Sequence, residues 1–216
     1  MPFSLLQRLR DIPLAFIDVE TNGCSARRGS RVIEIGIVRV EGGRSVAEYQ
    51  QLVDPRRRIS PQITLLTGIT PAMCAGKPTF AQLAPVIVPL LAGAVVVGHN
   101  VRFDLSFLYT ELRRAHVAIA EALGKLPVLD TVRLARKQFG RGGNSLLPLS
   151  RRLGIDAVEA HRALADAKTT HLLFQELLLP HGGWDLTLAD AFARQGGPMH
   201  LELEEPDMQL SEAVRV

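Results

Sequence analysis

The 216-residue chain is 47% hydrophobic and 5% aromatic, which is enough apolar content for one domain with its own core but too few rings for an extended base-stacking platform. Its formal net charge of +3 and pI near 9.2 permit a polyanionic partner without requiring one. Two cysteines indicate no disulfide framework, the apolar segments are too short to span a bilayer, and Asp11 and Pro13 interrupt the stretch where a secretory signal would lie, so we expect a cytoplasmic protein without membrane contact.

The first predicted strand begins with an apolar run at residues 14–17 and ends in two acids, Asp18 and Glu20. The run is short and lacks helical spacing, which favours a buried strand. Since side chains alternate along a strand, both carboxylates point to the same face. Residues 32–40 and 45–53, separated by a glycine pair, have the composition of two further strands, and the three together predict an antiparallel meander.

The rest of the chain alternates helices with two short strands. The strand at residues 94–98 is apolar throughout, as expected for a strand covered on both faces, and another follows at residues 127–129. Predicted helices span residues 63–66, 79–91, 99–114, 131–138, 145–153, 162–178 and 184–194. This order predicts an α/β domain with a mixed five-stranded sheet, an antiparallel meander plus parallel strands, flanked by helices. We assign residues 1–181 to this domain and residues 182–216 to a C-terminal helix and a loose acidic tail.

The paired acids of the first strand indicate a metal site. Two carboxylates crowded on one face repel each other and lose hydration, and a cation between them removes that cost. Asp104 follows the strand at residues 94–98 by one short loop, and ligands gather at strand ends in open α/β sheets. An acid near a helix start also favours the helix dipole, so Asp104 alone does not decide between the two interpretations.

Asp166 lies on the face of the helix at residues 162–178 that becomes apolar further along, with leucines at spacings of seven and eleven. A carboxylate there needs a partner, which is either an Arg or Lys or the metal already implied. His161 is five residues earlier and would point away from Asp166 on a continuous helix, so we place it in the preceding loop, where it can act as a base. A lone histidine is more often structural, but its place beside an acid of this set favours a catalytic role. Four converging carboxylates suit two hard divalent cations and phosphoryl chemistry.

Three motifs resemble those of the DEDDh 3′–5′ exonucleases, the DnaQ-like group that includes proofreading epsilon subunits of DNA polymerase III. They are FIDVETNG at residues 16–23, GHNVRFDLSFL at residues 98–108 and HRALADA at residues 161–167. Their order and spacing fit over about residues 12–180, and the combination is far more specific than a single glycine-rich motif.

The resemblance implies a ribonuclease H-like fold and a metal-dependent 3′–5′ exonuclease that releases 5′-mononucleotides from DNA, expected to be single-stranded, in proofreading or repair. It implies that two divalent cations, Mg²⁺ or Mn²⁺, are held by Asp18, Glu20, Asp104 and Asp166. His161 would take a proton from the attacking water. The implied substrate contacts, in which Leu66 or Ile69 wedges against the terminal base, are Thr21, Asn22, Leu66, Ile69, Asn100 and Phe103.

Basic side chains near the acidic site must attract a polyanionic substrate, unless they only form a solvated face. The candidates are Arg27, Arg28, Arg31, Arg56, Arg57, Arg58 and Arg102. Three alternatives stay open: an exoribonuclease that trims RNA or short oligonucleotides, a non-catalytic nucleic-acid-binding scaffold, and a subunit bound to a DNA polymerase or replication complex. The complete set of acids argues against the scaffold, and no sequence feature separates DNA from RNA.

Overall fold

The computed structural model describes residues 3–117, 126–156 and 161–199. Its centre is one five-stranded mixed sheet with strand order β3-β2-β1-β4-β5. The strands are β1 (Leu14–Thr21), β2 (Val32–Glu41), β3 (Arg44–Leu52), β4 (Val95–Gly98) and β5 (Val128–Asp130). β1 pairs antiparallel with β2, and β2 with β3, whereas β1–β4 and β4–β5 are parallel. The predicted meander and mixed sheet are therefore confirmed, with β1 in the middle.

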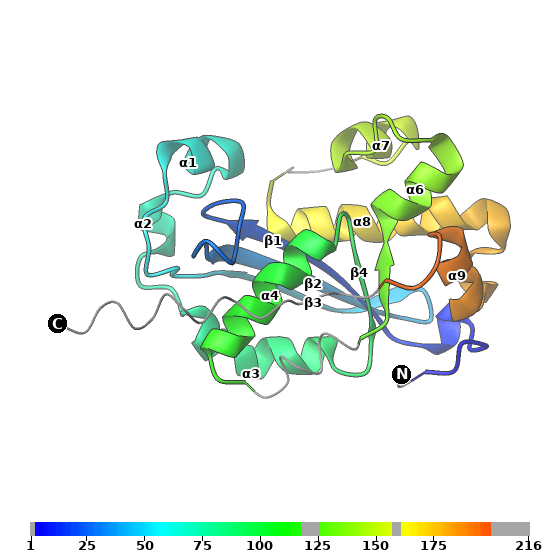
Figure 1. The fold of residues 1–216 in the computed structure, drawn as a ribbon, viewed down its shortest axis with the longest axis horizontal. Coiled ribbons are helices and arrows are strands. Elements are labelled where there is room, and N and C mark those ends of the chain that lie inside the picture. The colour runs from blue at the N-terminus through cyan, green and yellow to red at the C-terminus, as the bar shows by residue number, and fades with distance from the viewer. Residues whose placement is uncertain (1–2, 118–125, 157–160, 200–216) are drawn as a thin grey trace.

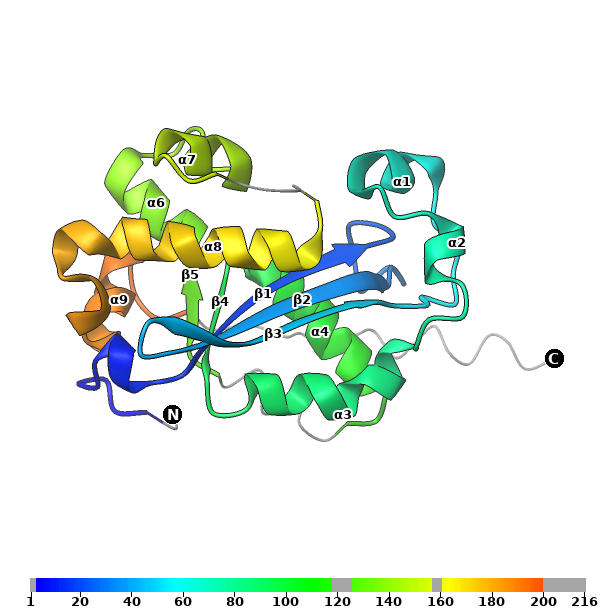
Figure 2. The ribbon, with the colours of Figure 1, turned by 180° about the vertical axis from the view of Figure 1, so that it is seen from behind.

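Helices cover both faces of the sheet. α3 and α4 lie on one face, and the long helix α8 crosses the other together with α6 and α9 (Figures 1 and 2). The helices are α1 (Pro61–Thr67), α2 (Pro71–Cys74), α3 (Phe80–Leu91), α4 (Arg102–Arg114), α6 (Thr131–Phe139), α7 (Leu146–Arg152), α8 (Ala163–Leu178) and α9 (Leu188–Arg194). Short 3-10 turns occupy Leu9–Asp11, Leu179–His181 and Gly183–Asp185.

The helix ends follow from local chemistry. The Ser60 hydroxyl accepts from the Ile63 N–H at 3.3 Å, Pro61 takes the first helical position, and Gly68 ends α1 with a positive φ of 70°. Asp130 caps α6 by accepting from the Val132 N–H at 2.8 Å. These starts lie within two residues of the predicted ones, because cap residues are a local signal.

Two apolar clusters fill the space on either side of the sheet. Ile17 of β1 packs with α3 and α4, whereas Phe16 packs with α6, α8 and α9. This division results from the alternation of side chains along the strand. Within the described residues, no helix combines the length and the apolar character needed to cross a bilayer.

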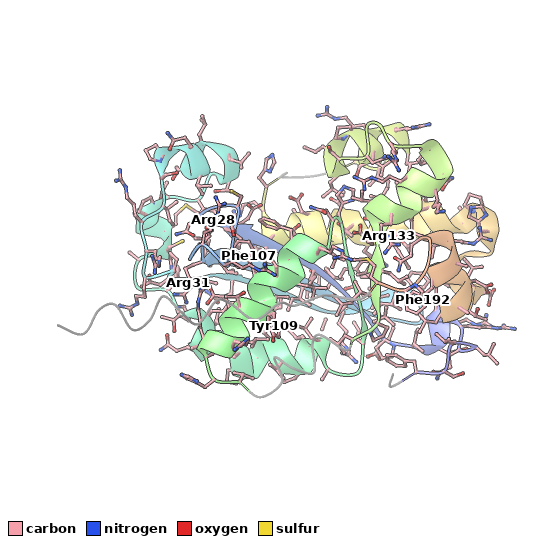
Figure 3. The ribbon with its side chains drawn as sticks, in the orientation of Figure 1. Arg28, Arg31, Phe107, Tyr109, Arg133 and Phe192 are labelled. Carbon is pink, nitrogen blue, oxygen red and sulfur yellow. The ribbon has the colours of Figure 1, made fainter. Side chains whose placement is uncertain are left out.

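The segment after residue 181 is part of this packing. Leu188, Ala191 and Phe192 of α9 are buried in the cluster that contains Phe174 of α8 (Phe192 is labelled in Figure 3). Gln195, 1% exposed, accepts from the Asp130 N–H at 2.9 Å and donates to the Val128 carbonyl at 3.0 Å, along the outer edge of β5. The predicted boundary at residue 181 therefore cuts through a shared core. The predicted tail begins at residue 196, and its residues 200–216 lie outside the described residues.

Candidate active site

Asp18 and Glu20 lie near the C-terminal end of β1 and face α8. Phe16 belongs to the core on the α8 side and Ile17 to the core on the other side, so alternation brings both acids onto the α8 face. The pairing of β1 with β4 ends at Phe16, and β1 continues alone along that edge. The two acids thus lie where the middle strand extends beyond its parallel neighbour.

Asp104 reaches this edge from α4. It is 3% exposed, and its Oδ1 accepts the Val19 N–H at 3.0 Å. Val19 lies beyond the stretch of β1 that pairs with β4, so the carboxylate takes the place of a ladder partner. Asp104 is also in the first turn of α4, where the helix dipole favours an acid. Its position therefore agrees with the helix-dipole interpretation, while its role as a metal ligand stays a prediction.

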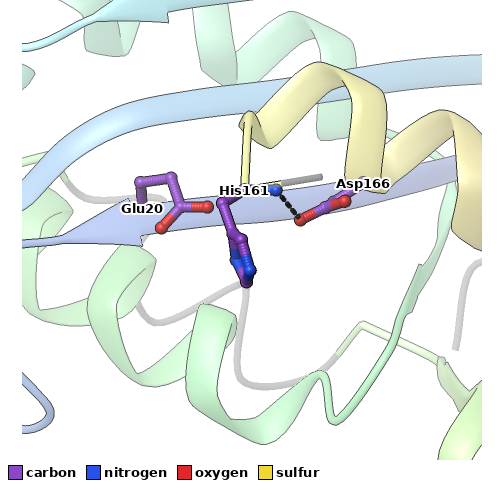
Figure 4. A group of neighbouring side chains, drawn as sticks. All are labelled: Glu20, His161 and Asp166. Carbon is purple, nitrogen blue, oxygen red and sulfur yellow. Dashed lines mark hydrogen bonds between the residues drawn. The ribbon is translucent and has the colours of Figure 1, made fainter. Parts of the chain in front are cut away.

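His161 and Asp166 approach from the start of α8. His161 lies before the helix, as its spacing from Asp166 predicted, and has a positive φ of 67°. The main-chain N–H of His161 donates to Asp166 Oδ2 at 3.2 Å (Figure 4). Potential ligand atoms of Glu20, His161 and Asp166 all lie within 4.8 Å of one another. The residues of the third motif, at positions 161–167, thus lie beside those of the first motif, at positions 16–23.

Burial and mutual repulsion dominate the electrostatics of the inner acids. Burial raises the pKa of Asp18 well above its ordinary value, and the charges of Asp104, Asp166 and Glu20 raise it further. Burial also raises the pKa of Asp104 well above its ordinary value, against the opposing effect of its hydrogen bond from Val19. These carboxyls are therefore held where ionisation is unfavourable unless positive charge is supplied.

The outer acids show the same pattern. Burial, followed by the charges of Asp166 and Glu34, raises the pKa of Glu20 to about 7, although Arg162 opposes the shift. Burial raises the pKa of Asp166, and the hydrogen bond from the His161 N–H opposes it. All four carboxyls are thus destabilised as anions by their position in the fold.

The donor set fits divalent cations. Carboxylate oxygens from β1, α4 and α8 are the ligands that hard cations such as Mg²⁺ and Mn²⁺ prefer, and an imidazole lies beside them. A bound cation would favour the ionised forms that burial disfavours. The repulsion among Asp18, Glu20, Asp104 and Asp166 is the structural observation that supports this fit.

Two of the expected substrate residues are engaged within the protein. The Thr21 hydroxyl, in a residue that is 7% exposed, donates to the Gly23 carbonyl at 2.7 Å. The Asn22 amide donates to the Arg58 carbonyl at 3.0 Å and accepts from the Arg31 N–H at 2.7 Å. Asn22 therefore connects two loops beside the end of β1, and these bonds use one N–H and one acceptor position of its amide.

The wedge residues differ from each other. Leu66 on α1 is 57% exposed and can meet a base, as can its neighbour Leu65 at 89%. Ile69 is 0% exposed and packs with Ile33 and Cys74, so the expectation that it touches a base is wrong for this conformation.

The other two expected contacts lie on the loop and helix that carry Asp104. Asn100 is exposed and has a positive φ of 65°. Phe103 is partly buried, with its ring 4.9 Å from that of Phe107. The exposed amide of Asn100 is therefore the more accessible group of the two.

Basic residues gather around the same end of β1. Arg31 is occupied, because its Nε and Nη2 bind both carboxylate oxygens of Glu111 at 2.6 and 2.7 Å. Arg28 and Arg57 are both exposed (Arg28 and Arg31 are labelled in Figure 3). Their loops are adjacent, because Gly29, next to Arg28 in the sequence, lies close to the Arg57 guanidinium. Arg28 and Arg57, rather than Arg31, are therefore the better candidates for contact with a phosphate backbone.

Sequence reasoning missed the buried acids Glu34 and Asp130, which lie beside the site. Glu34 is 0% exposed on β2, and Asp130 is 4% exposed at the end of β5, where it accepts from the Asn100 N–H at 3.1 Å and so holds the loop before α4. The signal for Glu34 was a single acid within an apolar strand pattern, and the signal for Asp130 was an acid at a strand end before a helix.

A model of the exonuclease family matches residues 15–174. DNA polymerase III subunit epsilon of Aquifex aeolicus is 36% identical over 182 residues, which cover 82% of this chain and 87% of the relative. The 3′-5′ exonuclease DinG of Bacillus subtilis is 37% identical over 163 residues, which cover 75% of this chain but only 17% of DinG. This chain thus spans a small part of the length of DinG.

Solved structures share the fold. Exonuclease X in complex with 5′ overhanging duplex DNA superposes with a TM-score of 0.63 at 27% identity, covering 85% of this chain and 99% of that chain. Exonuclease I superposes with a TM-score of 0.68 at 21% identity, covering 79% of this chain and 41% of that chain, and so supports the fold alone. The chain belongs to the exonuclease family, and both the resemblance to DnaQ-like 3′–5′ exonucleases and the ribonuclease H-like fold are confirmed.

Proposed function

We propose that this protein is a metal-dependent 3′–5′ exonuclease that removes 5′-mononucleotides from the 3′ end of single-stranded DNA. One observation supports this most strongly: four acidic side chains from β1, α4 and α8 converge with His161 at the C-terminal end of the middle strand. The relatives named as 3′-5′ exonuclease and as polymerase III epsilon support the same activity.

Each residue has a stated task in this proposal. Asp18, Glu20, Asp104 and Asp166 would hold two divalent cations, Mg²⁺ or Mn²⁺. When bound, such cations neutralise phosphate charge and make water a better nucleophile at neutral pH. His161 takes the proton of the attacking water.

Substrate binding is proposed to involve the surface around the acids. The exposed side chain of Leu66 on α1 packs against the terminal base, and Asn100 lies on the loop before α4. The exposed Arg28 and Arg57 attract the strand, because phosphates dominate nucleic-acid affinity. Thr21 contributes through its backbone at the end of β1.

Digestion of a 5′-labelled single-stranded oligonucleotide with Mg²⁺ or Mn²⁺ tests the activity. We expect stepwise shortening from the 3′ end that stops when a chelator is added. Asp18→Asn should lower the rate more than about a hundredfold, because changes outside the ligand sphere already cost about 10–100-fold. Asp11→Asn, an exposed acid before β1, is the matched control and should retain the rate. Equal digestion by Asp18→Asn and wild type would falsify the site assignment.

The proposed role of His161 has its own arm of the assay. Glutamine cannot take up a proton at neutral pH, so His161→Gln should lower kcat by about 10²–10⁴-fold while Mn²⁺ affinity changes little. His181→Gln, an exposed histidine at the far end of α8, serves as control. Loss of Mn²⁺ binding together with activity would show His161 to be a metal ligand instead.

Three finer assignments belong to the same proposal. An RNA strand of equal sequence, run in parallel, would reveal an exoribonuclease if it were degraded faster than DNA. Association with a DNA polymerase stays a prediction, which co-elution on a sizing column would check. A cytoplasmic location is supported by the two free thiols, Cys24 and Cys74, and localisation of a tagged chain would test it.

A further inference from the structure

Glu34 is a buried acid beside the site that the proposed chemistry does not use. It lies on β2 directly opposite Glu20 of β1 and is 0% exposed. A carboxylate in such a position is stable only when its oxygens are paired. The Arg162 Nη2 lies 2.8 Å from Oε1, and its Nε lies 3.2 Å from both oxygens. The Gln50 amide donates to Oε1 at 2.9 Å.

The same carboxylate also caps α8. Arg162 occupies the N-cap position but makes no capping bond with its own side chain, which cannot accept one. Glu34 Oε2 instead accepts from the Ala163 N–H at 3.0 Å. Negative charge at this end of a helix is stabilising. Glu34 thus holds the beginning of α8 through both the main chain and a side chain.

Gly36 sets how closely the helix approaches the sheet. It lies two residues after Glu34 on the same face of β2, and a Cβ there would be 2.2 Å from the Ala163 carbonyl carbon. Only glycine leaves room for this contact. β2 therefore offers the first turn of α8 a space to occupy and a carboxylate to bind.

His161 and Asp166 both depend on the position of that first turn. His161 directly precedes Arg162 and has a positive φ of 67°, a conformation that a non-glycine residue keeps only where its surroundings hold it. Asp166 lies one turn later, and its N–H donates to the Arg162 carbonyl at 3.0 Å. A displacement of Arg162 would move both groups relative to Glu20.

We propose that Glu34 and Arg162 form a positioning pair that orients His161 and Asp166 toward Glu20. The inference rests on the proposed exonuclease function. The pair acts through the start of α8 and balances the charge of Glu34 beside the metal-binding carboxylates. Its loss should therefore reduce turnover rather than the affinity for the DNA strand.

The test compares Glu34→Gln and Arg162→Gln with Lys168→Gln. Lys168 and Glu48 form a 2.7 Å ion pair that also joins α8 to the meander, but these side chains are 46% and 43% exposed. Steady-state digestion of the DNA oligonucleotide should show kcat reduced about 10–100-fold in the two buried-pair variants, with KM within about threefold of wild type. Lys168→Gln should stay within about twofold in both constants.

Calorimetric titration with Mn²⁺ gives a readout that does not depend on activity. The two buried-pair variants should bind Mn²⁺ about 10-fold more weakly, because Asp166 is displaced, whereas Lys168→Gln should bind as wild type does. The double variant should bind Mn²⁺ no more weakly than the weaker-binding single variant, since both changes break the same interaction. If the wild type proves inactive, the proposed function fails, and this titration alone decides the positioning role.

Unchanged kcat in both single variants would overturn the proposal. A raised KM with normal kcat in Arg162→Gln would also overturn it and make Arg162 a substrate-binding residue. If the glutamine variants melt below the assay temperature, Arg162→Lys decides, because lysine keeps the charge but cannot form the two-point contact. A folded Arg162→Lys protein with reduced kcat supports positioning, and one with wild-type kcat and Mn²⁺ affinity refutes it.

Discussion

Asp18 and Glu20 face the same side of β1 because strands alternate, and this could be predicted from their spacing alone. The partner of Asp104 could not be predicted, since the Val19 N–H is available only where β1 continues past the pairing with β4. Asn22 shows a second limit of sequence reasoning. The resemblance gave it a substrate contact, but its amide connects two loops whose proximity is a property of the folded chain.

The raised pKa values of the acids predict an unusual dependence of stability on pH. Glu20 has an ordinary pKa of 4.5 and a folded value of about 7, so between these values the folded chain binds more protons than the unfolded chain. The free energy of unfolding must then fall as pH rises through this window, by on the order of 2–3 kcal/mol for Glu20 alone. Metal-free protein should melt at a lower temperature at pH 8 than at pH 5, as scanning calorimetry in chelator would measure.

Divalent cations supply the control for this effect. Mg²⁺ or Mn²⁺ binds the ionised carboxylates, so the ion should raise the melting temperature more at pH 8 than at pH 5. Glu20→Gln should flatten the metal-free pH dependence, because glutamine does not titrate. A metal-free melting temperature that rises steadily over this pH range would contradict the assigned pKa shifts.

Helix α8 illustrates what a pattern of residues can and cannot specify. Its extent was predicted as residues 162–178 and is Ala163–Leu178, because the apolar face and the terminal proline are local signals. Its docking depends on Gly36 and Glu34, which are more than a hundred residues away in the sequence. A glycine within a strand has several possible meanings, and only the packed structure selects one.

Gly36→Ala tests the contact between β2 and α8. The new methyl group would lie 2.2 Å from the Ala163 carbonyl carbon, which is backbone and cannot rotate away. Overpacking of this kind destabilises by about 1–3 kcal/mol, and the shifted helix start should also reduce kcat. Urea unfolding gives the free energy, and the oligonucleotide assay gives the rate.

Gly142→Ala is the matched control, because a Cβ at that loop position meets nothing within 4 Å. It should change the free energy of unfolding by no more than about 0.5 kcal/mol. If Gly36→Ala unfolds at the same urea concentration as Gly142→Ala and remains equally active, the close approach is not a constraint on the site.

The architecture as a whole was predictable where signals were local and repeated. Five strands with alternating or fully apolar patterns indicated the mixed sheet. The C-terminal limit of the domain was not predictable, because Gly182 and Gly183 mark a change in composition that resembles a linker. In the structure the chain turns there and returns to the N-terminal segment. The Leu9 N–H donates to the Leu186 carbonyl and the Leu188 N–H donates to the Gln7 carbonyl, both at 2.9 Å.

A chain that ends at residue 181 should therefore be much less stable than one that ends at residue 199. Removal of α9 exposes the core that Leu188 and Phe192 now cover, and each fully buried side chain of this size contributes about 1.5–3 kcal/mol. The sum is a large share of the roughly 5–15 kcal/mol that typically stabilises a domain. Loss of Gln195 also leaves the Asp130 N–H and the Val128 carbonyl at the edge of β5 without their present partner. Urea unfolding of the two chains measures the difference in their free energies of unfolding. Equal midpoints would show that α9 does not stabilise the domain, which would agree with the predicted boundary at residue 181.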